Sequence, residues 1–375
     1  MSAKSWTSST ASGSPRGWPG SSRSGSSRAD GPAGPHPYTG WAVALRVGLI
    51  GFGYWGPNLA RNFGEIRGVS VTAVADRRAD RREAVAARHP AVRLFEDPAE
   101  LIARPDVDAV VVATPVSTHY ELGLAALKAG KDVLIEKPLA ATGAEAEMLV
   151  EVAAREGRVL MVDHTYVYAG AVRKIADLVD TGELGEIRYY DSLRINLGLF
   201  QSDVSVMWDL AIHDIALLQY LVRRRFLTVQ ATGGCHLGEG LESVAHLTLG
   251  LDGGAQAHVN VSWISPVKIR QTIIVGDRKM LLYDDLEPDE KIKVYDRGVV
   301  FDEDRPALLR DYRIGDMWSP RVDRREALAG VCAHFVQCVQ TRARPLTGGP
   351  EGVESVRVLE AAQWSLRHAG QLVKL

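Results

Sequence analysis

The feature that most constrains the fold is a glycine-rich turn placed directly after a short apolar segment. The turn has the pattern Gly51-x-Gly53-x-x-Gly56, and a segment with a helical pattern follows it. Asp76 ends the next apolar segment, twenty residues beyond Gly56. A glycine triplet alone is also compatible with a purely structural turn. In this strand, turn and helix context, with a distant carboxylate, it indicates a dinucleotide-binding fold.

The three glycines have separate roles in such a site. The first permits the tight turn, the second lets the backbone approach a pyrophosphate, and the third lets the helix pack closely on the strand. The carboxylate of Asp76 would accept hydrogen bonds from a ribose diol and repel a 2′-phosphate, which favours NAD over NADP. Arg77 and Arg78 could instead bind that phosphate, so NADP remains the alternative. The cofactor-binding residues predicted in this region are Gly51, Phe52, Gly53, Tyr54, Trp55, Gly56, Asp76 and Arg77.

Residues 43–163 alternate short apolar runs with helical patterns. Apolar runs without polar alternation are typical of a parallel sheet covered on both faces. The sequence therefore predicts an α/β domain with a doubly wound parallel sheet, a Rossmann domain, over 43–163. Strands are predicted at 45–50, 69–75, 108–113 and 132–136, and helices after Pro57 and at 77–89 and 117–129.

The pattern changes after Glu186, where apolar and polar residues begin to alternate. Alternation is typical of an antiparallel sheet with one open face. The sequence thus predicts an α+β domain with an open, mostly antiparallel sheet over 164–375. Its strands are predicted at 187–195, 227–233, 243–249, 256–263, 269–275 and 279–283, with a helix at 206–222. Further helices, at 169–181, 324–341 and 353–368, pack on this sheet or return to the first domain.

The N-terminal segment differs in composition from the remainder. Residues 1–40 contain 11 Ser, 7 Gly and 5 Pro and no apolar periodicity, so we predict a disordered tail over 1–42 and assign it no function. The whole chain has 44 Lys plus Arg against 46 Asp plus Glu, which argues against nucleic acid or an acidic membrane as a partner. No apolar stretch approaches the ~20 residues that span a bilayer.

Three cysteines without a CxxC pattern argue against a disulfide framework and a structural zinc site. They favour a reducing, cytoplasmic location. The chain also lacks HxH and HExxH spacings, so we predict no metal site.

Lys137 follows the predicted strand 132–136 directly, at the edge where ligands of doubly wound sheets bind. Its ammonium could hold a substrate hydroxyl and stabilise a developing alkoxide, although an exposed loop lysine is the alternative. Asp209 and His213 lie four residues apart and would share a helix face, where the carboxylate orients the imidazole and raises its basicity. A surface ion pair is the alternative, and the apolar residues between them count against it.

Polar residues at other strand ends complete the candidate site. Those expected to contact the cofactor, beyond the glycine turn, are Thr114, Pro115, His119 and Glu136. Those expected to contact substrate hydroxyls or phosphates are His164, Tyr166, Arg194 and Asn196, for which ordinary surface positions are an equal alternative.

Four motifs in register resemble the glucose–fructose oxidoreductase, inositol dehydrogenase and MocA (Gfo/Idh/MocA) family, over almost all of 45–375. They are Gly51-Phe52-Gly53-Tyr54-Trp55-Gly56, Ala113-Thr114-Pro115 with His119, Glu136-Lys137-Pro138 and Asp209-x-x-x-His213. The resemblance implies a Rossmann domain followed by an open sheet that carries substrate and often mediates dimer or tetramer contacts. It implies that Lys137, Asp209 and His213 are catalytic, with His213 as the acid/base.

Three further segments look most like family members that act on nucleotide sugars or on sugars of antibiotic assembly. They are 194–198, 208–211 and 263–270, and on this resemblance Trp208 is assigned to the substrate. The Ser/Gly-rich extension departs from the family pattern. So does Glu326-Ala327-Leu328, where many relatives carry Glu-Pro-Leu.

These features predict an NAD-dependent dehydrogenase that moves a hydride between nicotinamide and a secondary alcohol or ketone of a sugar, aminosugar or nucleotide sugar. A homo-oligomer is expected. One alternative is a redox-neutral glycosidase that uses bound NAD transiently. The other is a non-catalytic NAD-binding sensor of metabolites.

Overall fold

The computed structural model describes residues 44–198, 200, 204–238, 240–300 and 311–375, which all belong to one structural unit. The tail predicted to be disordered, 1–42, lies outside the described residues.

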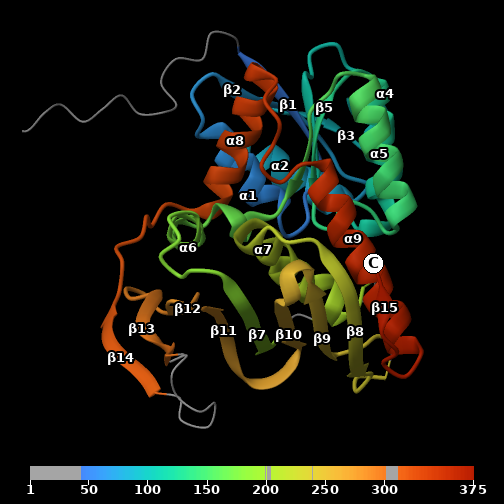
Figure 1. Cartoon of the computed structure of the whole chain (residues 1–375). Coiled ribbons are helices and arrows are strands. Elements are labelled where there is room, and N and C mark those ends of the chain that lie inside the picture. Colours follow the sequence, from blue (N-terminus) through green and yellow to red (C-terminus); the bar gives the residue numbers. More distant parts are fainter. Residues whose placement is uncertain (1–43, 199, 201–203, 239, 301–310) are drawn as a thin grey trace, which may run out of the picture. The chain divides into compact units, whose positions relative to one another are not determined.

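The first sheet consists of parallel strands in the order β3-β2-β1-β4-β5-β6 (Figure 1). β4 and β5 are buried along their whole length, as expected between two helical layers. The order reverses between β1 and β4, and ligands of such sheets bind beyond the carboxyl ends of the strands at that point. The strands are β1 (Leu45–Ile50), β2 (Val69–Ala75), β3 (Arg93–Phe95), β4 (Ala109–Val112), β5 (Asp132–Glu136) and β6 (Leu160–Asp163).

Helices connect these strands, and local signals fix where several of them begin. Asp97 caps α3 by accepting a hydrogen bond from the Ala99 N–H, and α5 begins with a capping box between Thr142 and Glu145. The helices are α1 (Gly56–Gly64), α2 (Ala79–Arg88), α3 (Pro98–Ile102), the short η1 (Val116–Thr118), α4 (His119–Lys128) and α5 (Gly143–Arg155). The sequence prediction missed α5 and the short elements β3, α3 and β6.

The second sheet has the order β14-β13-β12-β11-β7-β10-β9-β8-β15. Its pairings are antiparallel except that of β7 with β10. The predicted fold class is therefore confirmed, although β13, β14 and β15 were not predicted. The strands are β7 (Ile187–Leu197), β8 (Phe226–Gly234), β9 (Val244–Leu251), β10 (Gln256–Ser262), β11 (Ile264–Gly276), β12 (Met280–Asp284), β13 (Ile292–Val300), β14 (Asp311–Trp318) and β15 (Val373–Lys374). A short 3-10 turn, η4 (Asp252–Gly254), joins β9 to β10.

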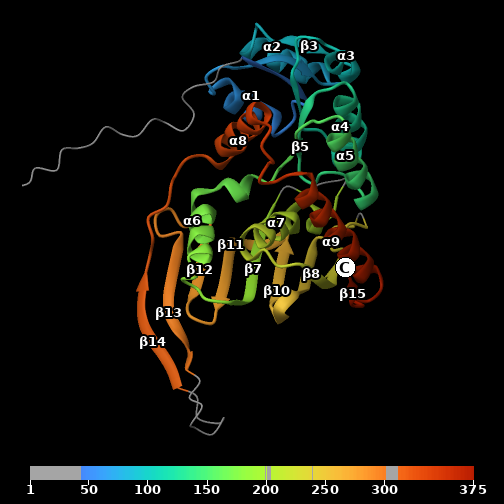
Figure 2. The same ribbon diagram turned by 45° about the horizontal axis from the view of Figure 1, so that its top comes forward.

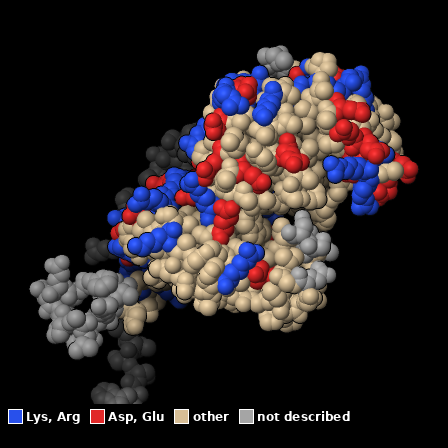
Figure 3. All heavy atoms as spheres, turned by 90° about the vertical axis from the view of Figure 1, so that its right-hand side faces the viewer, with Lys and Arg blue, Asp and Glu red and all other residues tan. Residues whose placement is uncertain are grey.

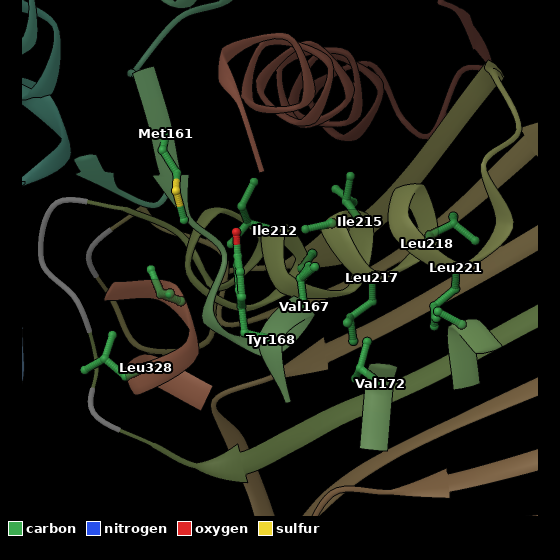
Figure 4. Close-up of a cluster of buried hydrophobic side chains, with 14 of the residues drawn as sticks. Met161, Val167, Tyr168, Val172, Ile212, Ile215, Leu217, Leu218, Leu221 and Leu328 are labelled. Carbon is green, nitrogen blue, oxygen red and sulfur yellow. The ribbon is translucent and has the colours of Figure 1, made fainter. Parts of the chain in front are cut away.

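Helices cover one face of this sheet, and α6 and α7 lie along it in Figure 2. The covering elements are η2 (Thr165–Tyr168), α6 (Gly170–Asp180), η3 (Met207–Ala211) and α7 (Ile212–Val222). Their apolar side chains form a continuous core (Figure 4), in which Val167 of η2 and Val172 of α6 point toward α7. On the opposite face Leu193 remains partly exposed and Ile273 is 42% exposed.

The two C-terminal helices connect the sheets. α8 (Ala327–Thr341) packs against α1 and η2, while α9 (Gly349–Arg367) packs against both α5 and β8 (Figure 1). The sequence had left open whether these helices stay with the second sheet. Each of them contacts elements of both domains, since α1 flanks the first sheet and η2 covers the second.

Charged side chains of both signs occur on the face shown in Figure 3, and neither sign dominates it. Among the described residues, no helix is both long enough and apolar enough to cross a membrane.

Candidate active site

The glycine turn between β1 and α1 has the shape of a cradle. Gly51 has φ +94°, and a Cβ there would lie 2.4 Å from the Ala113 carbonyl oxygen. A Cβ on Gly56 would lie 2.5 Å from the Gly51 oxygen, so both glycines are needed for close packing. A Cβ on Gly53 would meet no atom within 4 Å. The turn is therefore closely packed at Gly51 and Gly56 and open at Gly53. The open side, at the start of α1, fits a pyrophosphate.

Asp76 is fixed beside this turn. Its carboxylate accepts hydrogen bonds from the Phe52 N–H at 2.7 Å and the Arg78 N–H at 2.9 Å. The guanidinium of Arg78 binds Asp80, and the Arg77 side chain is exposed. An anion placed to receive a ribose, with Arg78 already paired, fits NAD rather than NADP.

Two aromatic residues of the turn are exposed. Tyr54 is 73% exposed and Trp55 37% exposed, with their rings edge to face. Phe52, in contrast, is buried in the core, so it contributes its backbone to the turn.

His119 occupies a different place from the one predicted. Its ring is buried, with Nδ1 2.8 Å from the Pro138 oxygen and Nε2 2.9 Å from the Thr114 oxygen. The side chain thus ties the loop after β4 to the loop after β5 and does not face the open side. Thr114 is held as well, because its hydroxyl lies 2.7 Å from that of Thr118. Pro115 lies between them, at the start of η1.

Lys137, directly after β5 of the first sheet, forms an ion pair with Asp209 of η3, which covers the second sheet. Its Nζ donates to the Asp209 backbone oxygen at 2.9 Å and to Oδ1 at 3.0 Å. The Trp263 Nε1–H donates to the other carboxylate oxygen at 3.2 Å. The side chains of Lys137 and Asp209 are 13% and 19% exposed. The predicted alternative of an exposed loop lysine is therefore wrong, and the pair forms a partly buried ion pair at the carboxyl end of β5.

The expected pairing of Asp209 with His213 is wrong. The chain forms a π-helical turn, η3, at 207–211, where residues four apart no longer align, and becomes α-helical at 212. The Asp209 carboxylate is turned to Lys137 and Trp263, while His213 packs edge-on against Tyr166 with ring centroids 4.7 Å apart.

The environment of His213 lowers its pKa well below the ordinary value. Burial is the largest cause, and the positive charges of Lys137 and Arg194 add to it. The basicity is thus lowered, not raised as the sequence suggested. The ring stays neutral at neutral pH, and Nδ1 is buried without a hydrogen-bond partner among the described residues.

Arg194 differs from its predicted role of direct substrate contact. It is buried and forms two hydrogen bonds to Asp214, at 2.8 and 3.1 Å. Its guanidinium lies 4.5 Å from the centroid of the Tyr166 ring, and that of Arg270 lies 5.7 Å from the same centroid. Arg194 therefore holds Tyr166, which in turn packs on His213. Asp214 and Arg270 were not predicted, because their proximity depends on how α7, β7 and β11 pack.

The other predicted substrate residues differ in solvent exposure. Asn196 is partly exposed near the end of β7, and Trp208 is partly buried against the core from η3. His164 is only 2% exposed, and both of its ring nitrogens lack a hydrogen-bond partner among the described residues. Burial, followed by the charge of Lys137, lowers the pKa of His164 to about 3.

Two buried carboxyl groups, those of Glu136 and Asp163, lie close to Lys137. Glu136 and Asp163 are register partners on β5 and β6, are both buried, and each keep one oxygen without a partner in the described part of the chain. Burial raises the pKa of both, and the charge of Asp163 adds to the effect on Glu136. Asp163 was not predicted because the four-residue strand β6 was missed.

No group of three or more His, Cys, Asp or Glu side chains suited to a metal ion occurs within the described residues. The cysteines there are free thiols, with Cys235 exposed and Cys332 and Cys338 buried.

The sheet order, the glycine cradle and the Lys137–Asp209 pair together indicate an NAD-dependent oxidoreductase. A family profile described as an oxidoreductase family with an NAD-binding Rossmann fold matches residues 45–164, and one described as the GFO/IDH/MocA C-terminal domain matches residues 172–282. The chain belongs to the Gfo/Idh/MocA family, as its motifs suggested.

Named relatives agree with this class. The scyllo-inositol 2-dehydrogenase (NAD(+)) of Bacillus subtilis is 25% identical over 337 residues, which cover 86% of this chain and 94% of the relative. Among solved structures, UDP-N-acetylglucosamine 3-dehydrogenase from Acidithiobacillus ferrooxidans matches with a TM-score of 0.73 and 25% identity, over 86% of this chain and 98% of that one.

A levoglucosan dehydrogenase solved with NADH has a TM-score of 0.76 at 19% identity, over 88% of this chain and 98% of that one, and shows the shared fold. Four other relatives named as inositol dehydrogenases align over 52–60% of their own length. The predicted class and its NAD cofactor are confirmed, and the glycosidase and sensor alternatives gain no support.

Proposed function

We propose that the chain oxidises a secondary alcohol of a sugar-like substrate, or reduces the corresponding ketone, with Lys137, Asp209 and His213 as its catalytic residues. The observation that carries the proposal is the partly buried Lys137–Asp209 pair at the carboxyl end of β5, with the neutral, partly exposed His213 on the adjoining α7.

Each residue has a distinct task. The Lys137 ammonium holds the substrate oxygen and stabilises negative charge that develops there. Asp209 positions this ammonium through two hydrogen bonds and balances its charge. His213 accepts the hydroxyl proton during oxidation and returns it during reduction. Its lowered pKa keeps the imidazole free to accept a proton at neutral pH.

The glycine turn and Asp76 would hold NAD, with the pyrophosphate over Gly53 and the ribose at the Asp76 carboxylate. When bound, NAD supplies the acceptor or donor of the hydride. His119 contributes by holding together the loops after β4 and β5.

The substrate class rests on the relatives and on the surroundings of His213. Inositol and UDP-N-acetylglucosamine dehydrogenases both act on ring alcohols by name, so a sugar, aminosugar or nucleotide sugar is the class proposed here. Tyr166, Arg270 and Asn196 would border its ring.

A second copy of the chain is proposed to cover the open face of the nine-stranded sheet. Leu193, Ile273, Val275, Met280 and Leu282 share this face and are at least partly exposed. An apolar sheet face of this kind favours burial against a partner surface. We further propose 43–163 as the NAD-binding domain and 164–375 as the substrate and oligomerisation domain. The free thiols support a cytoplasmic location.

The test is NADH formation from a panel that contains myo-inositol, scyllo-inositol and UDP-N-acetylglucosamine. Lys137→Ala should lower kcat by about 10³-fold with NAD affinity nearly unchanged, because the ammonium acts on the substrate oxygen. Lys128→Ala, which removes an exposed lysine at the end of α4, is the matched control. Full turnover in Lys137→Ala would refute the assignment.

A further inference from the structure

His164 lines a cavity whose α7 wall includes Ala216, three residues beyond the proposed catalytic His213 on the same helix. It precedes η2, which packs against α7, the helix that carries His213. The charge of Lys137 lowers the pKa of both His164 and His213, so both rings lie within its electrostatic range.

The cavity has a volume of about 220 Å³ and is bordered by α7, η2 and the start of α9. An ordered water needs roughly 10–15 Å³ of such space, so several can be accommodated. Gln219, Thr347 and Glu351 provide polar partners along its wall. It also reaches Arg223, whose side chain is 53% exposed at the end of α7.

The ring of His164 is unusual because neither nitrogen has a partner among the described residues, although the residue is only 2% exposed. An unsatisfied buried polar group costs roughly 1–3 kcal/mol, and such groups usually have a functional reason or bind water. A neutral imidazole has one N–H donor and one acceptor nitrogen, which is the arrangement that passes a proton across a ring.

We propose that His164 relays protons between His213 and water in this cavity, a role that rests on the dehydrogenase activity proposed above. During oxidation the substrate hydroxyl proton moves to His213, which must lose it before the next turnover. One ring nitrogen of His164 accepts a proton by way of water while the other releases its own proton to the cavity. The hop leaves the imidazole neutral with its N–H on the other nitrogen, rotation of the ring then returns the N–H to the cavity side, and the sequence runs backwards during reduction.

The test compares hydride and proton transfer in a single turnover. Enzyme and NAD are mixed with the most rapidly oxidised member of the panel in weak buffer, while NADH absorbance and a pH indicator are followed together. In the wild type, proton release keeps pace with NADH formation. In His164→Phe we expect release to lag at least about tenfold, while the first hydride transfer changes less than about twofold, because His213 still accepts the first proton. Free imidazole should restore release in His164→Ala.

A second variant leaves both histidines in place. Ala216→Leu narrows the cavity from its α7 wall and should delay proton release in the same way. His368→Phe, in which the replaced ring stacks on Trp364 at the surface, is the control.

The outcomes separate the two proposals. Proton release that keeps pace with NADH formation in His164→Phe and Ala216→Leu overturns the relay and leaves the dehydrogenase standing. A raised KM with unchanged proton kinetics in His164→Phe makes His164 a substrate contact and also overturns the relay. A wild type that forms no NADH from any member of the panel contradicts the proposed function and, with it, the relay.

Discussion

The two sheets present their functional groups in opposite ways. In the six-stranded sheet the groups lie on the loops that follow buried strands, as Lys137 does after β5. In the nine-stranded sheet they lie mainly on η3 and α7, the elements that cover one face, while the other face stays open. The first sheet thus supplies strand ends, and the second supplies a covering helical layer and an open face.

For cofactor affinity, the largest effect should come from the glycine turn of the first sheet. Gly53→Val places a side chain in the open space above the turn and should weaken NAD binding by at least about 100-fold, since a pyrophosphate could no longer approach the backbone. Titration by calorimetry measures this. Gly64→Val is the control, because a Cβ at Gly64 also meets no atom within 4 Å but lies at the far end of α1. Equal affinities in the two variants would contradict the cofactor position.

A substitution on the open face of the second sheet should affect catalysis less, but it should change the oligomeric state. Ile273→Lys places a charge among the apolar side chains of β11 and should convert the proposed oligomer to monomers, as measured by light scattering. Leu372→Lys, at a residue 60% exposed elsewhere, should not do so. A wild type that is already monomeric would show that this face has no partner copy.

The smallest effect concerns the pH dependence of oxidation. His213 must be neutral to accept a proton, so the rate falls as the pH drops through its pKa, which lies well below the ordinary value. The charge of Arg270 is one cause of that lowering, after burial and other positive groups. Arg270→Met should therefore move the acid limb of kcat/KM to higher pH, by less than about one unit.

Arg297→Met is a matched control for this shift, because Arg297 also lies over a tyrosine ring, that of Tyr295, at 5.2 Å. It is on β13, outside the site. An acid limb that stays in place in Arg270→Met would remove His213, or the influence of Arg270 on it, from the proton transfer.

Four strands of the first sheet could be predicted because they are short, mostly apolar segments, and the turn at Gly51 has a distinctive spacing. β3, with three residues, and β6, with four, are too short to show a pattern. β13 and β14 belong to an edge of the second sheet where residues such as Tyr312 and Ile314 are exposed, so apolar and polar positions do not separate.

The sequence predicted which residues belong to the candidate site better than it predicted how their side chains pair. The spacing of Asp209 and His213 predicted that both side chains lie on one face of an α-helix. In the structure a π-helical turn includes Asp209, and its carboxylate accepts a hydrogen bond from Lys137. A single turn of this kind has no clear sequence signal. The hydrogen bond between Arg194 and Asp214 depends on packing between segments that are distant in the sequence. The same holds for the buried position of His164, whose ring nitrogens have no hydrogen-bond partner among the described residues.

The pairing of β7 bears on how the chain is synthesised and folded. Both neighbours of β7, β10 and β11, lie in residues 256–276, about sixty positions later in the chain. On the ribosome the nascent strand 187–197 therefore has two unpaired edges until those residues emerge, whereas the six parallel strands are complete by residue 163. An unpaired strand can associate with another nascent chain, so chaperone demand should be concentrated in this interval.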